Sequence, residues 1–120
     1  MPDRDTTPIS QLVSHAASLV DPEGTDPEVE GLVLAFEDDD RPARGLPGLR
    51  EELQSTVEGM DPDGDSPAAR MAAAVAFFLS GAPEDERDRE GLLRVAARLF
   101  YGDALPDPVE QWLALQGVSP

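Results

Sequence analysis

The sequence predicts an all-α fold: a compact bundle of five to six helices around a buried central helix at about residues 66–80. Apolar residues recur with helical spacing, no stretch alternates with the two-residue period of a strand, and four segments begin with a capping residue followed by proline. At 120 residues the chain is long enough for one core. Residues 1–120 are therefore expected to form a single helical domain, frayed at 1–6 and 118–120.

The helix boundaries come from local capping chemistry. A side-chain acceptor at the N-cap, followed by proline at the first helical position, marks four helix starts: Thr7-Pro8, Asp26-Pro27, Ser66-Pro67 and Asp107-Pro108. Four glycines sit where helices commonly end: Gly59, Gly81, Gly102 and Gly117. These marks and the apolar spacing predict helices at about 7–20, 26–37, 46–59, 66–80, 83–101 and 107–116.

All segments except the fourth carry an apolar stripe on one side. The stripes include Leu12, Val13 and Ala16 in the first; Val29, Leu32, Val33 and Phe36 in the second; Leu49, Leu53 and Val57 in the third; Leu92, Leu93, Ala96, Leu99 and Phe100 in the fifth; and Val109, Trp112, Leu113 and Leu115 in the sixth. The fourth segment is apolar nearly all round, which is typical of a buried helix. We expect its Met71, Val75, Phe78 and Leu79 to pack against the first, third and fifth segments.

Charge is the strongest global signal. The formal net charge is −16, and all nine basic residues are arginines. Such a chain is not expected to bind nucleic acid or an anionic membrane, because both attract basic surfaces. Residues 1–40 hold eleven acidic side chains against Arg4 alone. This concentration favours an acidic binding face, whereas a salt-adapted (halophilic) proteome would explain a high acidic content everywhere; both interpretations stay open.

The composition also bears on location. The chain has no cysteine, so disulfides, thiolate metal sites and cysteine nucleophiles are excluded. The first twenty residues show no signal-peptide pattern, and the longest apolar run, residues 71–79, is about half of what a bilayer requires. A cytoplasmic location is expected.

One acidic turn resembles the start of a calcium loop. Asp61, Asp63 and Asp65 have the alternate spacing of the first three EF-hand ligands and are weak metal candidates. However, Ser66 stands where the loop needs glycine, and Ala72 stands where it needs a bidentate glutamate. An acidic turn that ends at the Ser66 cap is the favoured interpretation, and no metal site is predicted.

Catalytic motifs are weak. The acidic pairs Glu37/Asp40 and Asp85/Asp88 could hold Mg²⁺ in a metal-dependent all-α hydrolase, but 25 acidic residues produce such pairs by chance. His15, the sole histidine, lies at the border of an apolar stripe without a recognisable nucleophile motif. We predict no cofactor and no enzymatic activity, with the hydrolase as an alternative.

The acidic run Asp38, Asp39 and Asp40 is a candidate contact for a partner protein with a basic face. Arg41, Arg44 and Arg50 follow this run, and neutralisation of the acidic loop is favoured over an anion-binding site.

Trp112 on the last helix is a second candidate contact, because tryptophan is enriched at binding hot spots. It could equally pin its short helix to the core.

The predicted function is protein–protein interaction of an adaptor, inhibitor, immunity-protein or chaperone type, by a monomer or homodimer. A nucleic-acid mimic that inhibits a DNA-binding protein is a further alternative, which would need regularly spaced exposed carboxylates.

Overall fold

Six α-helices dominate the part of the chain that the computed structural model describes, residues 8–41, 48–60, 66–81, 88–102 and 104–118. In chain order they are α1 (Ile9–Val20), α2 (Pro27–Ala35), α3 (Leu49–Met60), α4 (Pro67–Gly81), α5 (Arg89–Tyr101) and α6 (Asp107–Leu115). Residues in these ranges form no strand. The all-α prediction is confirmed.

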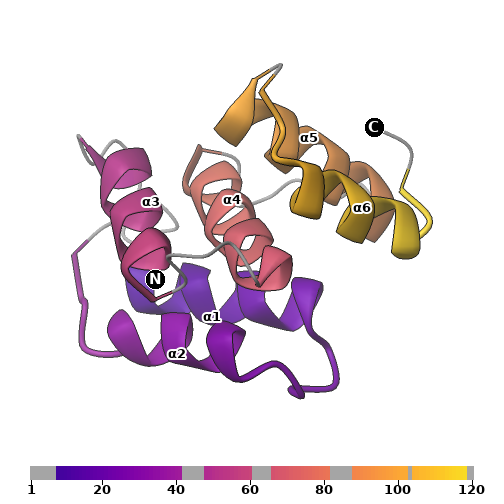
Figure 1. The fold of residues 1–120 in the computed structure, drawn as a ribbon. Helices are drawn as coiled ribbons and strands as arrows, with labels where there is room; N and C mark the ends of the chain where they lie inside the picture. The colour runs from indigo at the N-terminus through magenta and orange to yellow at the C-terminus, as the bar shows by residue number, and fades with distance from the viewer. Residues whose placement is uncertain (1–7, 42–47, 61–65, 82–87, 103, 119–120) are drawn as a thin grey trace.

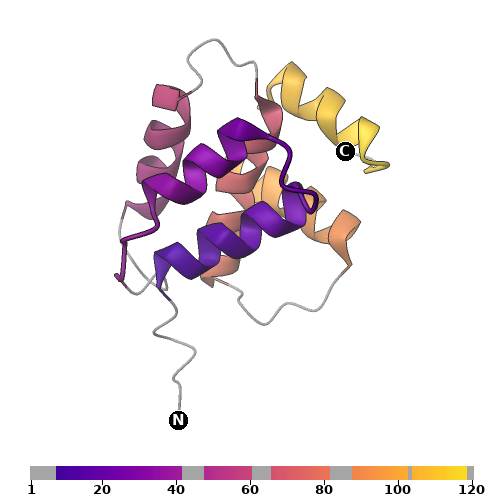
Figure 2. The ribbon, with the colours of Figure 1, turned by 90° about the horizontal axis from the view of Figure 1, so that it is seen from below.

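Helix α4 is the centre of the bundle, as predicted. It stands between α3 on one side and α5 and α6 on the other, and α1 and α2 lie side by side over one face (Figures 1 and 2). Its most extensive contacts are with α1, α5 and α3. Met71, Val75, Phe78 and Leu79 are all buried, and the remaining positions are mostly alanine. Short alanine side chains let neighbouring helices approach α4 from several directions.

Two of the four predicted helix starts have the expected cap geometry. The Asp26 carboxylate accepts hydrogen bonds from the backbone N–H groups of Glu28 and Val29, at 3.0 and 3.3 Å. The Ser66 hydroxyl accepts from the backbone N–H of Ala69 at 3.4 Å. Each side chain satisfies N–H groups that the first helical turn leaves unpaired, so α2 and α4 begin where the sequence places them.

The other two starts differ from the prediction. Helix α1 begins at Ile9 after Pro8, and the proposed cap Thr7 lies outside the described residues. Helix α6 begins one residue early: Pro106 is its N-cap, and Asp107 is the first helical residue rather than the cap. With φ −63° and ψ 143°, Pro106 holds the extended backbone that a cap position needs, and proline at the second helical position also requires no N–H.

The structure also differs from the predicted helix boundaries at the start of α5, at Gly59, at Gly81 and at the start of α3. Asp88 is extended and caps α5 by accepting from the N–H of Gly91 at 2.8 Å, so this helix does not run through from residue 83. Gly59 lies inside α3 and Gly81 is the last residue of α4, so neither follows its helix. Gly102 and Gly117 have positive φ, as expected of residues that end helices. Helix α3 begins at Leu49, not at residue 46.

Burial departs from the predicted stripes at the C-terminal helices. Leu99 is 52% exposed and Leu115 is 84% exposed, although both were assigned to apolar stripes. Val118, assigned to a frayed end, is instead buried, and its N–H donates to the carbonyl of Leu113 at 2.9 Å. The turn after α6 folds Val118 back onto the core, and this contact depends on Gly117 with φ 82°.

Hydrogen bonds from Arg89, the first residue of α5, connect the end of α1 to the end of α6. Its Nε donates to the carbonyl oxygen of Leu19 at 2.6 Å, and its Nη2 donates to that of Val20 at 3.3 Å. Nη2 also donates to Oε1 of Gln116 at 3.0 Å. The guanidinium thus satisfies carbonyls at the end of α1, where the helix dipole favours positive charge, and links them to the end of α6.

Candidate functional site

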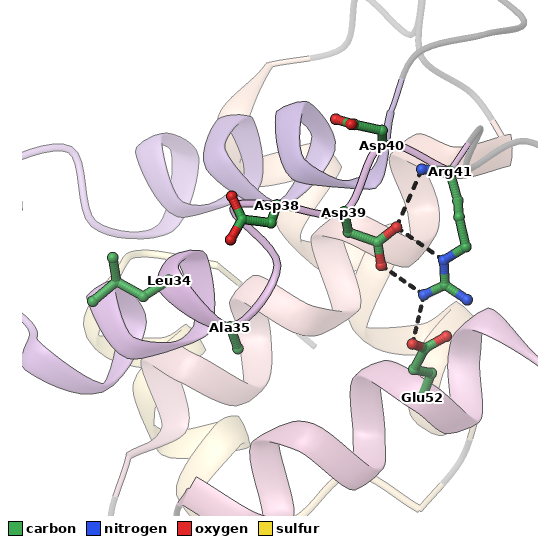
Figure 3. A pocket seen from close by; sticks show the side chains of 7 residues that line it. All are labelled: Leu34, Ala35, Asp38, Asp39, Asp40, Arg41 and Glu52. Carbon is green, nitrogen blue, oxygen red and sulfur yellow. Dashed lines mark hydrogen bonds and ion pairs between the residues drawn. The ribbon is translucent and has the colours of Figure 1, made fainter.

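The predicted acidic run lies where the end of α2 meets α3, beside an open depression of about 840 Å³ (Figure 3). We call this region the acidic corner and define it by the residues that line the depression: Leu34, Ala35, Asp38, Asp39, Asp40, Arg41 and Glu52. Leu34 and Ala35 belong to the last turn of α2, Glu52 belongs to the first turn of α3, and the others lie on the connection.

Arg41 is the centre of an ion-pair cluster in the acidic corner. Its Nε and Nη2 donate to the two carboxylate oxygens of Asp39, at 2.9 and 2.6 Å, and Nη2 also donates to Oε1 of Glu52 at 2.6 Å. The backbone N–H of Arg41 donates to Asp39 as well, at 3.2 Å. One cation therefore neutralises carboxylates from two segments of the chain. This confirms the predicted neutralisation for Arg41.

Of the other two arginines of that prediction, the structure describes only Arg50. Arg50 is directed to α5 instead: it donates to the carbonyl oxygen of Phe100, with Nε at 3.0 Å, and its guanidinium lies 5.4 Å from the centre of the Phe100 ring. It thus satisfies an otherwise unpaired carbonyl near the end of α5. Arg44 lies outside the described residues.

The backbone of the acidic run completes α1. The N–H of Ile9 donates to the carbonyl of Arg41 at 3.0 Å, and the N–H of Ser10 donates to that of Asp39 at 3.2 Å. Pro8 offers no side-chain cap, so these carbonyls satisfy two N–H groups that the first turn leaves unpaired. The negative charge of the run is unfavourable at the C-terminal end of the α2 dipole but favourable at the N-terminal end of the α1 dipole. The two backbone hydrogen bonds to α1 fix the position of the run.

Both partners in the main ion pair stay charged. The hydrogen bonds from the Arg41 side chain hold the pKa of Asp39 below its ordinary value of 3.8. Conversely, hydrogen bonds to Asp39 and Glu52 raise the pKa of Arg41 further above its usual range. Proton transfer chemistry at neutral pH has no support from these two groups, because neither titrates near 7.

The three carboxylates that were predicted to contact a partner differ in their exposure and in their ion pairing. Asp39 faces Arg41, and its side chain is only 16% exposed. Asp38 and Asp40 are exposed, and Figure 3 shows both away from the guanidinium. Among the described residues no cation pairs with either of them. Asp38 and Asp40 are therefore exposed to solvent, whereas Asp39 is bound to Arg41.

Sequence reasoning missed Leu34. It is 56% exposed and lines the same depression as the acidic side chains. A signal for it does exist. The second stripe contains residues 29, 32, 33 and 36, and an apolar residue at 34 falls outside that helical spacing.

Trp112 lies apart from the acidic corner, on α6. It is half-buried and packs against the core, and it also lines a hollow of about 510 Å³ between α6 and the α1–α2 connection. Both open interpretations of Trp112 thus describe part of its surroundings: it holds α6 to the core, and part of the side chain remains accessible.

The other candidate chemical residues are described only in part. Asp61, Asp63, Asp65 and Asp85 lie outside the described residues. Glu37 and Asp40 are both exposed, while the carboxylate of Asp88 caps α5. His15 is exposed on α1. Within the described ranges, no group of three or more histidine or acidic side chains is arranged to hold a metal ion.

Comparison with protein-family models, with characterised proteins and with solved structures finds no match for this chain. No helix in the part of the chain that the structure describes has both the length and the apolar character needed to cross a bilayer.

Proposed function

We propose that this protein acts by binding another protein with a basic surface, and that the acidic corner is the contact region. The observation that carries the proposal is an exposed leucine beside two exposed carboxylates that pair with no cation among the described residues: Leu34 is 56% exposed, and Asp38 and Asp40 line the same open depression. Adaptors, inhibitors, immunity proteins and chaperones all include members that work in this way, here as a monomer or homodimer in the cytoplasm.

The two kinds of side chain have different roles in the proposed contact. Burial of Leu34 against a partner removes apolar surface from water, at about 25 cal/mol per Å². Asp38 and Asp40 attract a basic partner over longer distances and raise the association rate, an effect that added salt weakens. The ion-pair cluster of Asp39, Arg41 and Glu52 keeps the surface in one arrangement, which limits the entropy lost on binding.

Matched variants test the proposal. Native lysate is passed over immobilised wild-type protein, over Leu34→Ser/Asp38→Asn/Asp40→Asn, and over a control, Leu115→Ser/Glu90→Gln/Glu110→Gln, that removes the same charge and one exposed leucine from α5 and α6. A protein retained by wild type and control but lost with the first variant is purified and titrated against all three by calorimetry. We expect binding at least tenfold weaker for the acidic-corner variant.

Equal affinity of all three proteins for the purified partner would contradict the proposal. Equal loss in both variants would contradict it as well, because net charge and not the acidic corner would then decide binding. Circular dichroism of the three proteins confirms that each one is folded before the comparison is made.

A further inference from the structure

The hollow beside Trp112 brings together side chains from four parts of the chain. It lies between the α1–α2 connection, the first turns of α4 and α5, and the last turns of α6. We call it the Trp112 hollow. The charged, amide and aromatic side chains that line it are Asp21, Glu23, Asp26, Arg89, Trp112 and Gln116. Its volume of about 510 Å³ lies within the range of small-ligand sites.

Negative charge dominates this lining. Three acidic residues, Asp21, Glu23 and Asp26, line the hollow together with one cation, Arg89, and the Asp26 carboxylate also caps α2. Arg89 already donates to the carbonyl oxygens at the end of α1 and to Gln116, so much of its hydrogen-bonding capacity is taken. The backbone N–H of Asp26 donates to the Asp21 carboxylate at 2.8 Å, which fixes that carboxylate on the wall of the hollow. This hydrogen bond also lowers the pKa of Asp21 below its ordinary value of 3.8.

The aromatic wall distinguishes this hollow from an acidic patch. Trp112 is the only tryptophan of the chain, and tryptophan binds cations over its ring face more strongly than the other aromatic side chains. A planar guanidinium can stack on an indole and donate in a fork to carboxylates at the same time, whereas an ammonium group does only part of this. The combination is therefore best matched by an arginine side chain.

We propose that the Trp112 hollow binds the guanidinium group of an arginine side chain presented by a protein partner, stacked on Trp112 and hydrogen-bonded to the carboxylates of the α1–α2 connection. The proposal rests on the proposed function in one respect, because it assumes a basic protein partner. It names a different surface, however, and a specific residue that the surface recognises.

N-Acetyl-arginine amide is the probe that tests this inference. It is titrated into the protein at constant ionic strength, with Trp112 fluorescence and the NMR signals of the indole and of backbone amides 21–26 as readouts. We expect saturable binding with a dissociation constant in the millimolar range. The neutral isostere N-acetyl-citrulline amide should cause no saturable change.

Two single-charge variants separate local from diffuse electrostatics. Glu23 and Glu37 are both exposed, but only Glu23 lines the hollow. Glu23→Gln should weaken binding of the arginine probe by about threefold, the scale of one exposed charge pair. Glu37→Gln and Asp38→Asn/Asp40→Asn should leave it unchanged. An equal response to both probes, equal weakening by Glu23→Gln and Glu37→Gln, or the absence of saturation would each overturn the inference.

The acidic-corner experiment and this one fail independently. If the acidic-corner variant loses its partner while the arginine probe does not bind, the proposed function stands and the Trp112 hollow is not an arginine site. If the probe binds at Trp112 and no partner depends on Leu34, Asp38 or Asp40, the proposed function fails at the acidic corner and the hollow remains.

Discussion

Helix α4 and the acidic corner differ in the number and exposure of their charged side chains. From Met71 to Ser80, α4 carries no ionisable side chain and is buried almost throughout. In the acidic corner two carboxylates, those of Asp39 and Glu52, share Arg41, and Asp38 and Asp40 are exposed to solvent. This difference indicates that the stability of the fold comes mainly from the apolar interior, whereas exposed ion pairs add little to it.

The largest expected effect concerns the interior. Phe78→Ala should lower the free energy of unfolding by about 3–5 kcal/mol, because Phe78 is 7% exposed and its loss leaves a cavity around α4. Urea denaturation measures the change. Phe77→Ala serves as a comparison, since Phe77 is only partly buried on the same helix and should cost less. A Phe78 variant as stable as wild type would show that packing around α4 does not dominate the stability of the fold.

A second variant examines a charged group that the fold does depend on. Arg89→Gln should destabilise the protein by about 2–3 kcal/mol, the usual scale for hydrogen bonds from a charged donor to groups that are then left unpaired. Arg98→Gln, an exposed arginine on the same helix, should change stability far less. Equal effects of Arg89→Gln and Arg98→Gln in thermal melts would show that net charge, and not the hydrogen bonds to α1, is what matters.

The effect of salt on the melting temperature tests how the charge of the whole surface contributes to stability. With net charge −16, self-repulsion should destabilise the fold at low ionic strength, so KCl should raise the melting temperature. The Debye length falls from about 30 Å at 0.01 M to about 3 Å at 1 M. A rise that ends near 0.2 M indicates ordinary screening, which favours a dedicated acidic face. A rise that continues to molar salt indicates a salt-adapted protein, and a flat response contradicts both.

The smallest expected effect lies within the acidic corner. Arg41→Gln should lower the melting temperature less than Arg89→Gln does, because Arg41 is exposed and exposed ion pairs contribute little. The same variant should raise the pKa of Asp39 toward 3.8, since the hydrogen bonds from Arg41 keep it lower in the wild type. NMR titration of the Asp39 carboxyl measures this shift.

The pH dependence of this variant has a defined sign. Because Asp39 has a lowered pKa in the folded state, its contribution to stability is present above the ordinary value of 3.8 and is lost as the pH falls through the lowered value. The difference in melting temperature between wild type and Arg41→Gln should therefore be constant near neutral pH and close in strong acid. A difference that widens in acid would contradict the assigned ion pair.

Local chemistry explains which parts of the fold could be predicted. The Asp26 and Ser66 caps and the apolar α4 depend on residues close together in sequence, so periodicity and capping rules identified them. The start of α1 was predicted one residue early, and its capping could not be predicted, because the carbonyls of Asp39 and Arg41 complete the first turn from some thirty residues away. The start of α5 was set six residues too early, because an acidic segment looked like a favourable first turn.

The candidate site was predicted in part for the same reason. The run Asp38–Asp40 is plain in the sequence, but the ion pair that joins this segment to α3 depends on Arg41 reaching Glu52, eleven residues further along. Leu99 and Leu115 show the reverse error: their spacing fits a stripe, yet both are largely exposed. Helical spacing defines which side chains share a face, but only the packing of neighbouring helices decides how much of that face is covered.

The Arg89 contacts also bear on the order in which the molecule is completed during synthesis. Arg89 follows the carbonyl of Leu19, which it binds, by 70 residues. At translation rates of about 5–20 residues per second, that carbonyl waits for about 4–14 s before its partner exists. Gln116, the acceptor on α6, is made later still. On the ribosome the last carbonyls of α1 therefore bind water until Arg89 and then Gln116 have been made.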